Sequence, residues 1–206
     1  MVKDSSKNKI LKKAKIEKPL EHCDWLNLEN PEYVKYHDKE WGVPIHNDRK
    51  LFEMLILEGA QAGLSWSTVL KKRENYRKAF DNFDYEKIAT YKAKKASELL
   101  KNEGIIRNKL KIEATIRNAA AFIKIRQEFK TFDKYLWNFV KNQPIKNKVK
   151  TMKDLPSRTE ISDAISKDLK KRGMNFVGST IIYAFMQACG MVNDHKMTCF
   201  RYQEIK

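Results

Sequence analysis

Glycine and proline are scarce in this chain, and their scarcity limits the folds open to it. Only 7 glycines and 5 prolines occur among 206 residues, well below the usual shares of roughly 7 % and 5 %. A β-sandwich or barrel needs many tight turns, and tight turns depend on these two residues. Hydrophobic residues make up 42 % of the chain, which is enough for a real core and excludes global disorder. The composition therefore predicts an all-α globular fold.

Hydrophobic periodicity indicates where the helices lie. Asp48 is expected to cap a helix that begins near Arg49. Leu51, Leu55 and Glu58 fall on one face of that helix. Further helices are expected over residues 68–80, 85–91, 94–102, 108–129, 132–141, 162–172 and 176–189. Loops are expected over 60–67 and 141–150, and no segment has a confident strand pattern.

The distribution of charged residues indicates a tail followed by a domain. Residues 1–21 contain seven lysines and few apolar residues, so we expect a basic disordered tail followed by a single helical domain over 22–206. The whole chain carries 42 basic against 26 acidic residues, a formal net charge of +16. Such a surface attracts polyanions, nucleic acid first and an anionic membrane second. Free use of lysine at solvent positions produces the same balance, so the charge alone does not decide.

The cysteines and the apolar segments bear on the cellular setting. Three cysteines are too few, and an odd number, for a secreted disulfide scaffold. No segment reaches the roughly 20 apolar residues of a membrane span, and the basic N-terminus lacks the apolar stretch of a secretory signal. We therefore expect a cytoplasmic protein with no membrane partner, and a monomer by default.

Two cysteines and two histidines form a candidate metal site. His195 and Cys199 are four residues apart, and Cys23 and His37 lie near the other end of the chain. A Cys₂His₂ set suits tetrahedral Zn²⁺, and four protein ligands leave no position for a substrate, so such a site is structural. It would join the N-terminal segment to the C-terminal one. Two unrelated cysteines and two ordinary histidines are the alternative.

Glu58 and a short turn are two further candidates. Glu58 shares a helix face with leucines, and a buried carboxylate is rare unless it has a partner or a function. It either meets a lysine or backbone amides, or it recognises a cationic or hydrogen-bond-donating ligand. Residues 101–107 place Gly104 between two helical patterns. That pattern fits a helix–hairpin–helix whose amides and second-helix N-terminus face a DNA phosphate, and it fits an ordinary helical hairpin equally well.

Several longer motifs carry a resemblance to a known family. They read HDKEWGVP at 37–44, LEGAQAGLSW at 57–66, TVLKKR at 68–73, GIIR at 104–107, KKRG at 170–173, FVG at 176–178, FMQACG at 185–190 and VNDH at 192–195. In this order and over about residues 22–200, the chain resembles the DNA-3-methyladenine glycosylase I family, often called TAG. The lysine-rich tail lies outside the resemblance.

The resemblance implies a fold, a cofactor and a set of site residues. It implies the helix–hairpin–helix DNA glycosylase fold and a structural Zn²⁺ on Cys23, His37, His195 and Cys199. It implies a pocket for the damaged base formed by Glu58 with Tyr33, Tyr36 and Trp66, and with Trp25 and Trp41 as further walls. It also implies DNA contacts at Gly63 and Leu64, which would enter the gap in the duplex, and at Gly104, Ile105 and Arg107 of the hairpin.

The implied chemistry agrees with what the sequence lacks. Adenine methylated at N3 is a cationic, easily released base. Many helix–hairpin–helix glycosylases use an aspartate about 20 residues after the hairpin, but residues 122–124 here are Phe, Ile and Lys, and Asp133 lies farther on. Three cysteines also exclude a four-cysteine iron–sulfur cluster. We therefore expect a monofunctional enzyme that removes 3-methyladenine from alkylated duplex DNA, releases the free base and leaves an abasic site.

Two other functions fit part of the sequence. A non-enzymatic DNA-binding module with a zinc site and a helix–hairpin–helix would show the same charge, hairpin and ligands. Such a module does not need aromatic residues around Glu58. A glycosylase for a different alkylated purine would need them, and only the released base distinguishes it.

Overall fold

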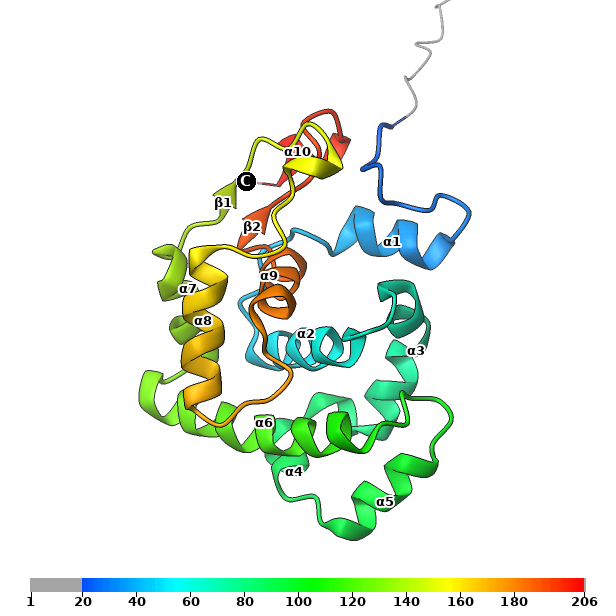
Figure 1. Cartoon of the computed structure of the whole chain (residues 1–206), viewed down its shortest axis with the longest axis vertical. Coiled ribbons are helices and arrows are strands. Elements are labelled where there is room, and N and C mark those ends of the chain that lie inside the picture. The colour runs from blue at the N-terminus through cyan, green and yellow to red at the C-terminus, as the bar shows by residue number, and fades with distance from the viewer. Residues whose placement is uncertain (1–19, 206) are drawn as a thin grey trace, which may run out of the picture.

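Helices account for almost all of the regular structure in the computed structural model, which describes residues 20–205 (Figure 1). The α-helices are α1 (Pro31–Lys39), α2 (Asp48–Gln61), α3 (Trp66–Ala79), α4 (Tyr85–Ala89), α5 (Ala93–Lys101), α6 (Lys109–Phe129), α7 (Phe132–Trp137), α8 (Glu160–Lys171), α9 (Ser179–Ala188) and α10 (Phe200–Glu204). Short 3₁₀ helices are η1 (Asp81–Phe83), η2 (Asn138–Val140) and η3 (Met152–Asp154). The all-α prediction is confirmed. The expected basic tail, apart from its last two residues, lies outside the described residues.

Two strands of two residues each are the exception to the helical pattern. They are β1 (Ile145–Lys146) and β2 (Val192–Asn193), which pair in parallel. No strand was expected from the sequence, because two residues are too few for an alternating pattern. Together with a bridge between Val149 and Lys196, the pair attaches the 145–150 segment to the C-terminal part of the chain.

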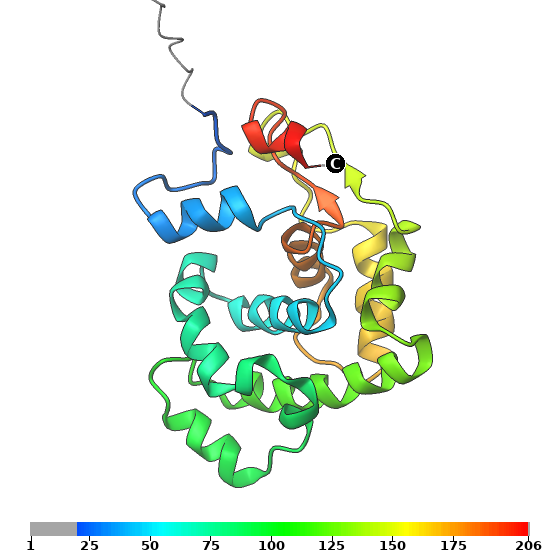
Figure 2. The same cartoon turned by 180° about the vertical axis from the view of Figure 1, so that it is seen from behind.

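Helix α2 is the centre of the fold. All residues from Leu51 to Ala60 are buried, and α3, α6, α7 and α9 pack around the helix. Both views show α2 enclosed between α9 on one side and α3 and α6 on the other (Figures 1 and 2). Glu58 therefore occupies the last turn of the most buried helix in the described chain.

The N-terminus of α2 differs from the expectation. Asn47, not Asp48, is the N-cap, and its side chain accepts the Lys50 N–H. The Asp48 carboxylate instead accepts the backbone N–H groups of Phe132 and Asp133, at 3.2 and 2.9 Å. Either residue type can cap a helix, so the prediction that Asp48 caps α2 was wrong by one position. Asp48 stabilises the start of α7 instead.

Other helix boundaries shift for local reasons. Helix α3 begins at Trp66 because Ser65 caps it, which shortens the expected 60–67 loop. Helix α9 begins at Ser179, three residues late, because Phe176 has a φ of +55° that no helix continues through. Helices α1 and α10 were not expected.

A glycine brings the segment after α1 against the end of α9. Gly190 has a φ of +74°, and a Cβ there would lie 2.4 Å from the Val43 carbonyl carbon. Backbone hydrogen bonds from Gly42 N to Gln187 O and from Ile45 N to Cys189 O, both 3.0 Å, complete the contact. Helix α1 is thereby held above α2 and beside α9, over the end of α2 that carries Glu58 (Figure 1).

A membrane-spanning segment was not expected, and within residues 20–205 every helix is too short or too polar to cross a bilayer.

Candidate active site

A pocket of about 200 Å³ opens where α1, α2, α3, α9 and η3 meet. Five of its lining residues are aromatic, one is a carboxylic acid and two are amides. The lining residues are Trp25, Tyr33, Tyr36, Trp41, Glu58, Gln61, Trp66, Met152, Leu155, Ala184 and Gln187. Glu58 and all five aromatic residues named from the sequence for a base pocket thus lie together. Gln61, Met152, Leu155, Ala184 and Gln187 were not expected there.

The aromatic side chains form two groups in the pocket walls. The rings of Tyr36 and Trp66 have centroids 5.2 Å apart. Trp25 contacts Trp41 edge-on at 4.8 Å and Tyr33 at 5.3 Å. Ring faces of this kind suit a flat π-system, and they attract a cation.

Glu58 is buried without a counter-charge. Only 4 % of the residue is exposed, and its Oε2 has no hydrogen-bond partner among the described residues. Burial raises the pKa of Glu58 to about 8. The purely structural alternative, in which a lysine or backbone amides pair with this carboxylate, is not found among residues 20–205. A buried carboxylate left without a partner is costly to the fold, which indicates a group kept for a ligand.

Three neighbours share the surroundings of Glu58. The indole N–H of Trp66 is buried and also lacks an acceptor among the described residues. Burial first, and the nearby Glu58 charge second, raise the pKa of Tyr36 and of Tyr33. Within the described residues, the pocket therefore presents an unused acceptor and an unused donor next to aromatic rings.

Lys111 holds the end of α2 that carries Glu58. Its ammonium group donates to the carbonyl oxygens of Ala60 and Ala62, at 2.7 and 2.8 Å. A cation at a helix C-terminus satisfies carbonyls that have no partner within the helix. Because Lys111 lies in the first turn of α6, it connects the hairpin helix to the site. Nothing in the sequence distinguishes Lys111 from the many other lysines.

The loop after α2 lies at the edge of the pocket. A second hollow of about 360 Å³ borders the first and is lined by Glu58, Gly63, Leu64 and Thr180, among others. Gly63 has a φ of +78° with open space around it, and Leu64 is 41 % exposed. An exposed leucine on a turn that favours glycine can enter a neighbouring molecule without rearranging the core.

The α5–α6 hairpin packs against α3. Gly104 N donates to Asn102 Oδ1 at 2.8 Å, and Ile106 N donates to the Tyr76 hydroxyl at 3.2 Å. Ile105 is 2 % exposed, so its side chain belongs to the core. We expected hairpin amides free to face a phosphate, but these two donate within the chain. Arg107 lies 3.4 Å from Glu103, and both side chains are more than half exposed, so Arg107 is a basic group that the turn presents outward.

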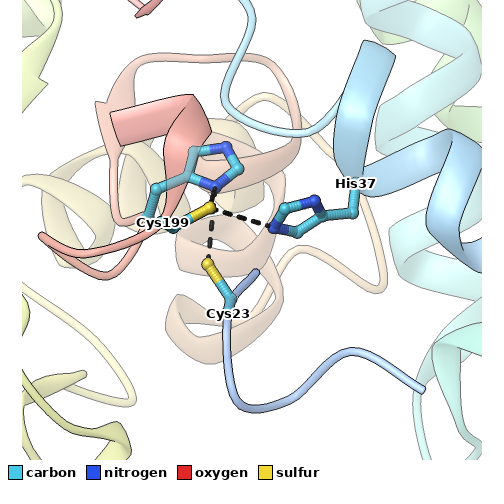
Figure 3. A group of neighbouring side chains, drawn as sticks. Cys23, His37 and Cys199 are labelled. Atoms are coloured by element: carbon cyan, nitrogen blue, oxygen red, sulfur yellow. Dashed lines mark hydrogen bonds between the residues drawn. The ribbon is translucent and has the colours of Figure 1, made fainter. Parts of the chain in front are cut away.

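The four candidate metal ligands converge. Figure 3 shows Cys23, His37 and Cys199 pointing toward one another from the N-terminal segment, α1 and the start of α10. Cys199 Sγ lies 3.6 Å from His37 Nε2 and 3.5 Å from His195 Nδ1, and Cys23 Sγ lies 3.4 Å from His195 Nδ1. All four residues are buried, and their ligand atoms lie within 4.8 Å of one another.

These distances fit a tetrahedral ion. Bonds of about 2.3 Å to sulfur and about 2.0 Å to nitrogen separate the ligand atoms by about 3.5 Å. The other ring nitrogens are also held, since His37 Nδ1 lies 2.7 Å from Asp38 Oδ1 and His195 Nε2 lies 3.1 Å from Trp41 O. The hydrogen bond between the side chains of Cys23 and Cys199 lowers the pKa of Cys199 and raises the pKa of Cys23. The cluster can hold a metal ion.

The candidate metal cluster supports the pocket wall. The Trp41 ring packs edge-on against His195 at 4.6 Å, and Trp25 packs against His37 at 5.3 Å. Two pocket aromatics thus rest directly on two of the ligand histidines.

Comparisons with known proteins agree on one family. A family model described as methyladenine glycosylase matches residues 25–202. DNA-3-methyladenine glycosylase 1 of Escherichia coli strain K12 is 50 % identical over 183 residues, which span 89 % of this chain and 97 % of that protein. A crystal structure of 3-methyladenine DNA glycosylase I (TAG) superposes with a TM-score of 0.85 at 52 % identity, over 87 % of this chain and 98 % of the other. A crystal structure of a single-residue variant of 3-methyladenine DNA glycosylase I in complex with 3-methyladenine superposes with a TM-score of 0.82 at 34 % identity, over 84 % and 92 % of the two chains.

Proposed function

The chain belongs to the methyladenine glycosylase family, and from this membership we propose how its pocket excises a base. It is a base-excision repair enzyme that removes 3-methyladenine from alkylated DNA by hydrolysis of the N-glycosidic bond. Family membership favours this activity over a DNA-binding module without catalysis. The residue roles below are the proposal.

The aromatic pocket receives the flipped base. Flipping costs a few kcal/mol and less for a poorly stacked lesion. The base stacks on Trp66 and Tyr36, and cation–π attraction adds roughly 0.5–2 kcal/mol. The unpartnered Glu58 carboxylate and Trp66 N–H carry this proposal, because an acceptor and a donor buried without partners are accounted for by a polar ligand between aromatic walls.

Glu58 complements the charge of the lesion. An adenine methylated at N3 is a cation while it is attached to deoxyribose. Glu58 in its ionised form accepts hydrogen bonds from this cation and stabilises it within a site that excludes most water. The binding energy thus depends on a charge that normal adenine lacks, which selects the damaged base.

The hydrolysis needs little further assistance. The bond between C1′ and N9 breaks, and its electron pair passes to the base and neutralises the positive charge. Water forms the new bond to C1′ and gives up a proton, so the products are neutral 3-methyladenine and an abasic deoxyribose. Asp133 is bound to His46 at 2.8 Å and does not line the pocket. Among the lining residues, Glu58 is the only acid, which suits a labile cationic substrate.

DNA is held on both sides of the pocket. Leu64, presented by the turn at Gly63, fills the space that the flipped nucleotide leaves. The hairpin around Gly104 and Ile105 holds Arg107 toward a phosphate, and a basic surface adds affinity that falls with salt. One chain supplies the whole pocket and the whole metal cluster, so we propose that a monomer acts.

Zn²⁺ is the metal we propose for the cluster of Cys23, His37, His195 and Cys199. Two sulfur and two nitrogen ligands at tetrahedral spacing suit this ion, and four protein ligands close its coordination sphere. When bound, it supplies structural cross-linking. The ligand residues join the N-terminal segment to the C-terminal one and support Trp25 and Trp41.

Base release from methylated duplex DNA tests the function. The purified protein is incubated with the DNA, and the released purines are identified by chromatography. We expect free 3-methyladenine above the rate without enzyme, and intact strands with abasic sites. Release of a different alkylated purine alone would assign another substrate, and binding without release would refute the proposal.

A further inference from the structure

Gln187 is a pocket residue whose side chain is held in one orientation. It lies in α9 and lines the pocket that contains Glu58. Its Nε2 lies 2.8 Å from Asp194 Oδ2. Gln187 lies in the FMQACG motif and Asp194 in the VNDH motif, and neither of these two residues received a role from the sequence.

Asp194 is a fully satisfied acceptor. It is 2 % exposed, and it accepts hydrogen bonds from Asn147 Nδ2 at 2.6 Å, from the Tyr183 hydroxyl at 2.7 Å and from Gln187. Burial, together with this hydrogen bond, raises the pKa of Tyr183, so its hydroxyl keeps the proton that it donates. The carboxylate is thereby fixed from three sides.

The contact decides which end of the Gln187 amide faces Asp194. An ionised carboxylate only accepts hydrogen bonds, so the NH₂ group must face it. The amide oxygen is then directed away from Asp194, and no donor among the described residues satisfies it. Gln61, the other amide that lines the pocket, has no side-chain hydrogen bond among those residues, so nothing fixes its orientation.

We propose that the Gln187 amide oxygen determines base specificity by accepting a hydrogen bond from the exocyclic amine of adenine. Asp194 is a positioning residue that acts through Gln187. This inference rests on the proposed function. Glu58 recognises the charge of the lesion, and Gln187 recognises which base carries that charge. A guanine lesion presents a carbonyl oxygen where adenine presents the amine. Two acceptors then face each other, and the base is rejected.

The test compares two lesions that share a charge and a methyl position. Methylated duplex DNA contains both 3-methyladenine and 3-methylguanine, so the ratio of their release rates reports recognition of the remaining base edge. Gln187→Met keeps the length of the side chain and removes the acceptor. We expect the kcat/KM ratio of 3-methyladenine to 3-methylguanine to fall about 10- to 100-fold, the range for one buried hydrogen-bonding group left unpaired. Gln61→Met, the matched control, should leave the ratio near that of the wild type.

Asp194→Asn tests the positioning role. An asparagine at this position can donate to the Gln187 oxygen, which lets the amide turn and present NH₂ to the base. The ratio should fall as in Gln187→Met, and the double variant should be no worse than Gln187→Met alone. A purely structural role would slow the release of both bases equally. Thermal melts establish that each variant is folded. If Asp194→Asn does not fold, the result for Gln187→Met alone decides whether Gln187 determines base specificity.

The outcomes separate this inference from the function on which it rests. An unchanged ratio in folded Gln187→Met overturns the specificity role of Gln187. A changed ratio there, with an unchanged ratio in folded Asp194→Asn, overturns the positioning role of Asp194. A wild-type protein that releases no 3-methyladenine overturns the proposed function, and this inference with it.

Discussion

Replacing Glu58 by glutamine should make the protein more stable and less active. Burial raises the pKa of Glu58 to about 8 from an ordinary value of 4.5. Between these two pH values the folded protein keeps a proton that the unfolded chain releases. The free energy of unfolding therefore falls as pH rises through this window, by about 1.4 kcal/mol per pH unit. The loss is absent below pH 4.5 and complete above pH 8.

The magnitude follows from the same values. At pH 7 the buried carboxyl costs about 3 kcal/mol of stability, and above pH 8 it costs about 5 kcal/mol. Glutamine has the same shape and does not ionise, so Glu58→Gln should recover these amounts. For a domain of this size, 3 kcal/mol corresponds to a rise of about 6–12 °C in melting temperature.

Thermal or urea unfolding at pH 4, 7 and 9 measures the effect. The two proteins should be equally stable at pH 4 and diverge as pH rises. Glu53→Gln is the matched control on the same helix, since Glu53 is paired with Arg73 at 2.6 Å and Arg77 at 2.7 Å. That variant should lose stability at pH 7, by up to roughly 3–5 kcal/mol. A stability gain in Glu58→Gln that does not change with pH would refute the reasoning.

The remaining predictions concern activity, metal and packing. The kcat/KM for base excision should rise between pH 6 and pH 8 and level off above, because free Glu58 must lose its proton; a profile that is flat over this range would count against a role for its charge. Elemental analysis should find one zinc ion per chain in the wild type and less in Cys199→Ser, with a lower melting temperature; equal metal content would exclude the cluster as the binding site. Lys111→Met should slow base excision more than it weakens DNA binding, because it frees the end of α2 near Glu58; equal losses in rate and affinity would indicate a DNA contact instead. Gly190→Ala should cost several kcal/mol of stability, since its Cβ would meet the Val43 backbone at 2.4 Å, and unchanged unfolding would show that the 43–44 segment can move.

Local pattern was enough to predict most of the helices. The long helix over 108–129 was placed within one residue of α6, because its apolar positions recur at helical spacing. The structure adds that Asn108 caps this helix. Helix α1 was missed since its segment is crowded with polar and aromatic residues. Asn30 as N-cap and Pro31 in the first turn were signals that could have located it.

The main residues of the candidate site were predicted from their chemistry and from the family resemblance. The contacts that connect these residues to the rest of the fold were not predicted. Glu58 was singled out because a carboxylate on an apolar helix face has to be explained. The four candidate metal ligands were singled out because cysteine and histidine are rare in this chain. Lys111 is one of many lysines, and Gln187 is an ordinary amide until its contact with Asp194 is seen. Such roles depend on which residues meet across the fold, and residue type does not reveal that.

Single-turnover release of 3-methyladenine by the wild type and by Glu58→Gln is the decisive test of whether the Glu58 charge drives base excision. The glutamine variant is expected to be the more stable protein at pH 7, so a slower reaction cannot be assigned to unfolding. We expect release by the wild type and a rate roughly 100-fold lower in the variant, the usual loss when a group that stabilises charge is removed. Equal rates in the two proteins would contradict it.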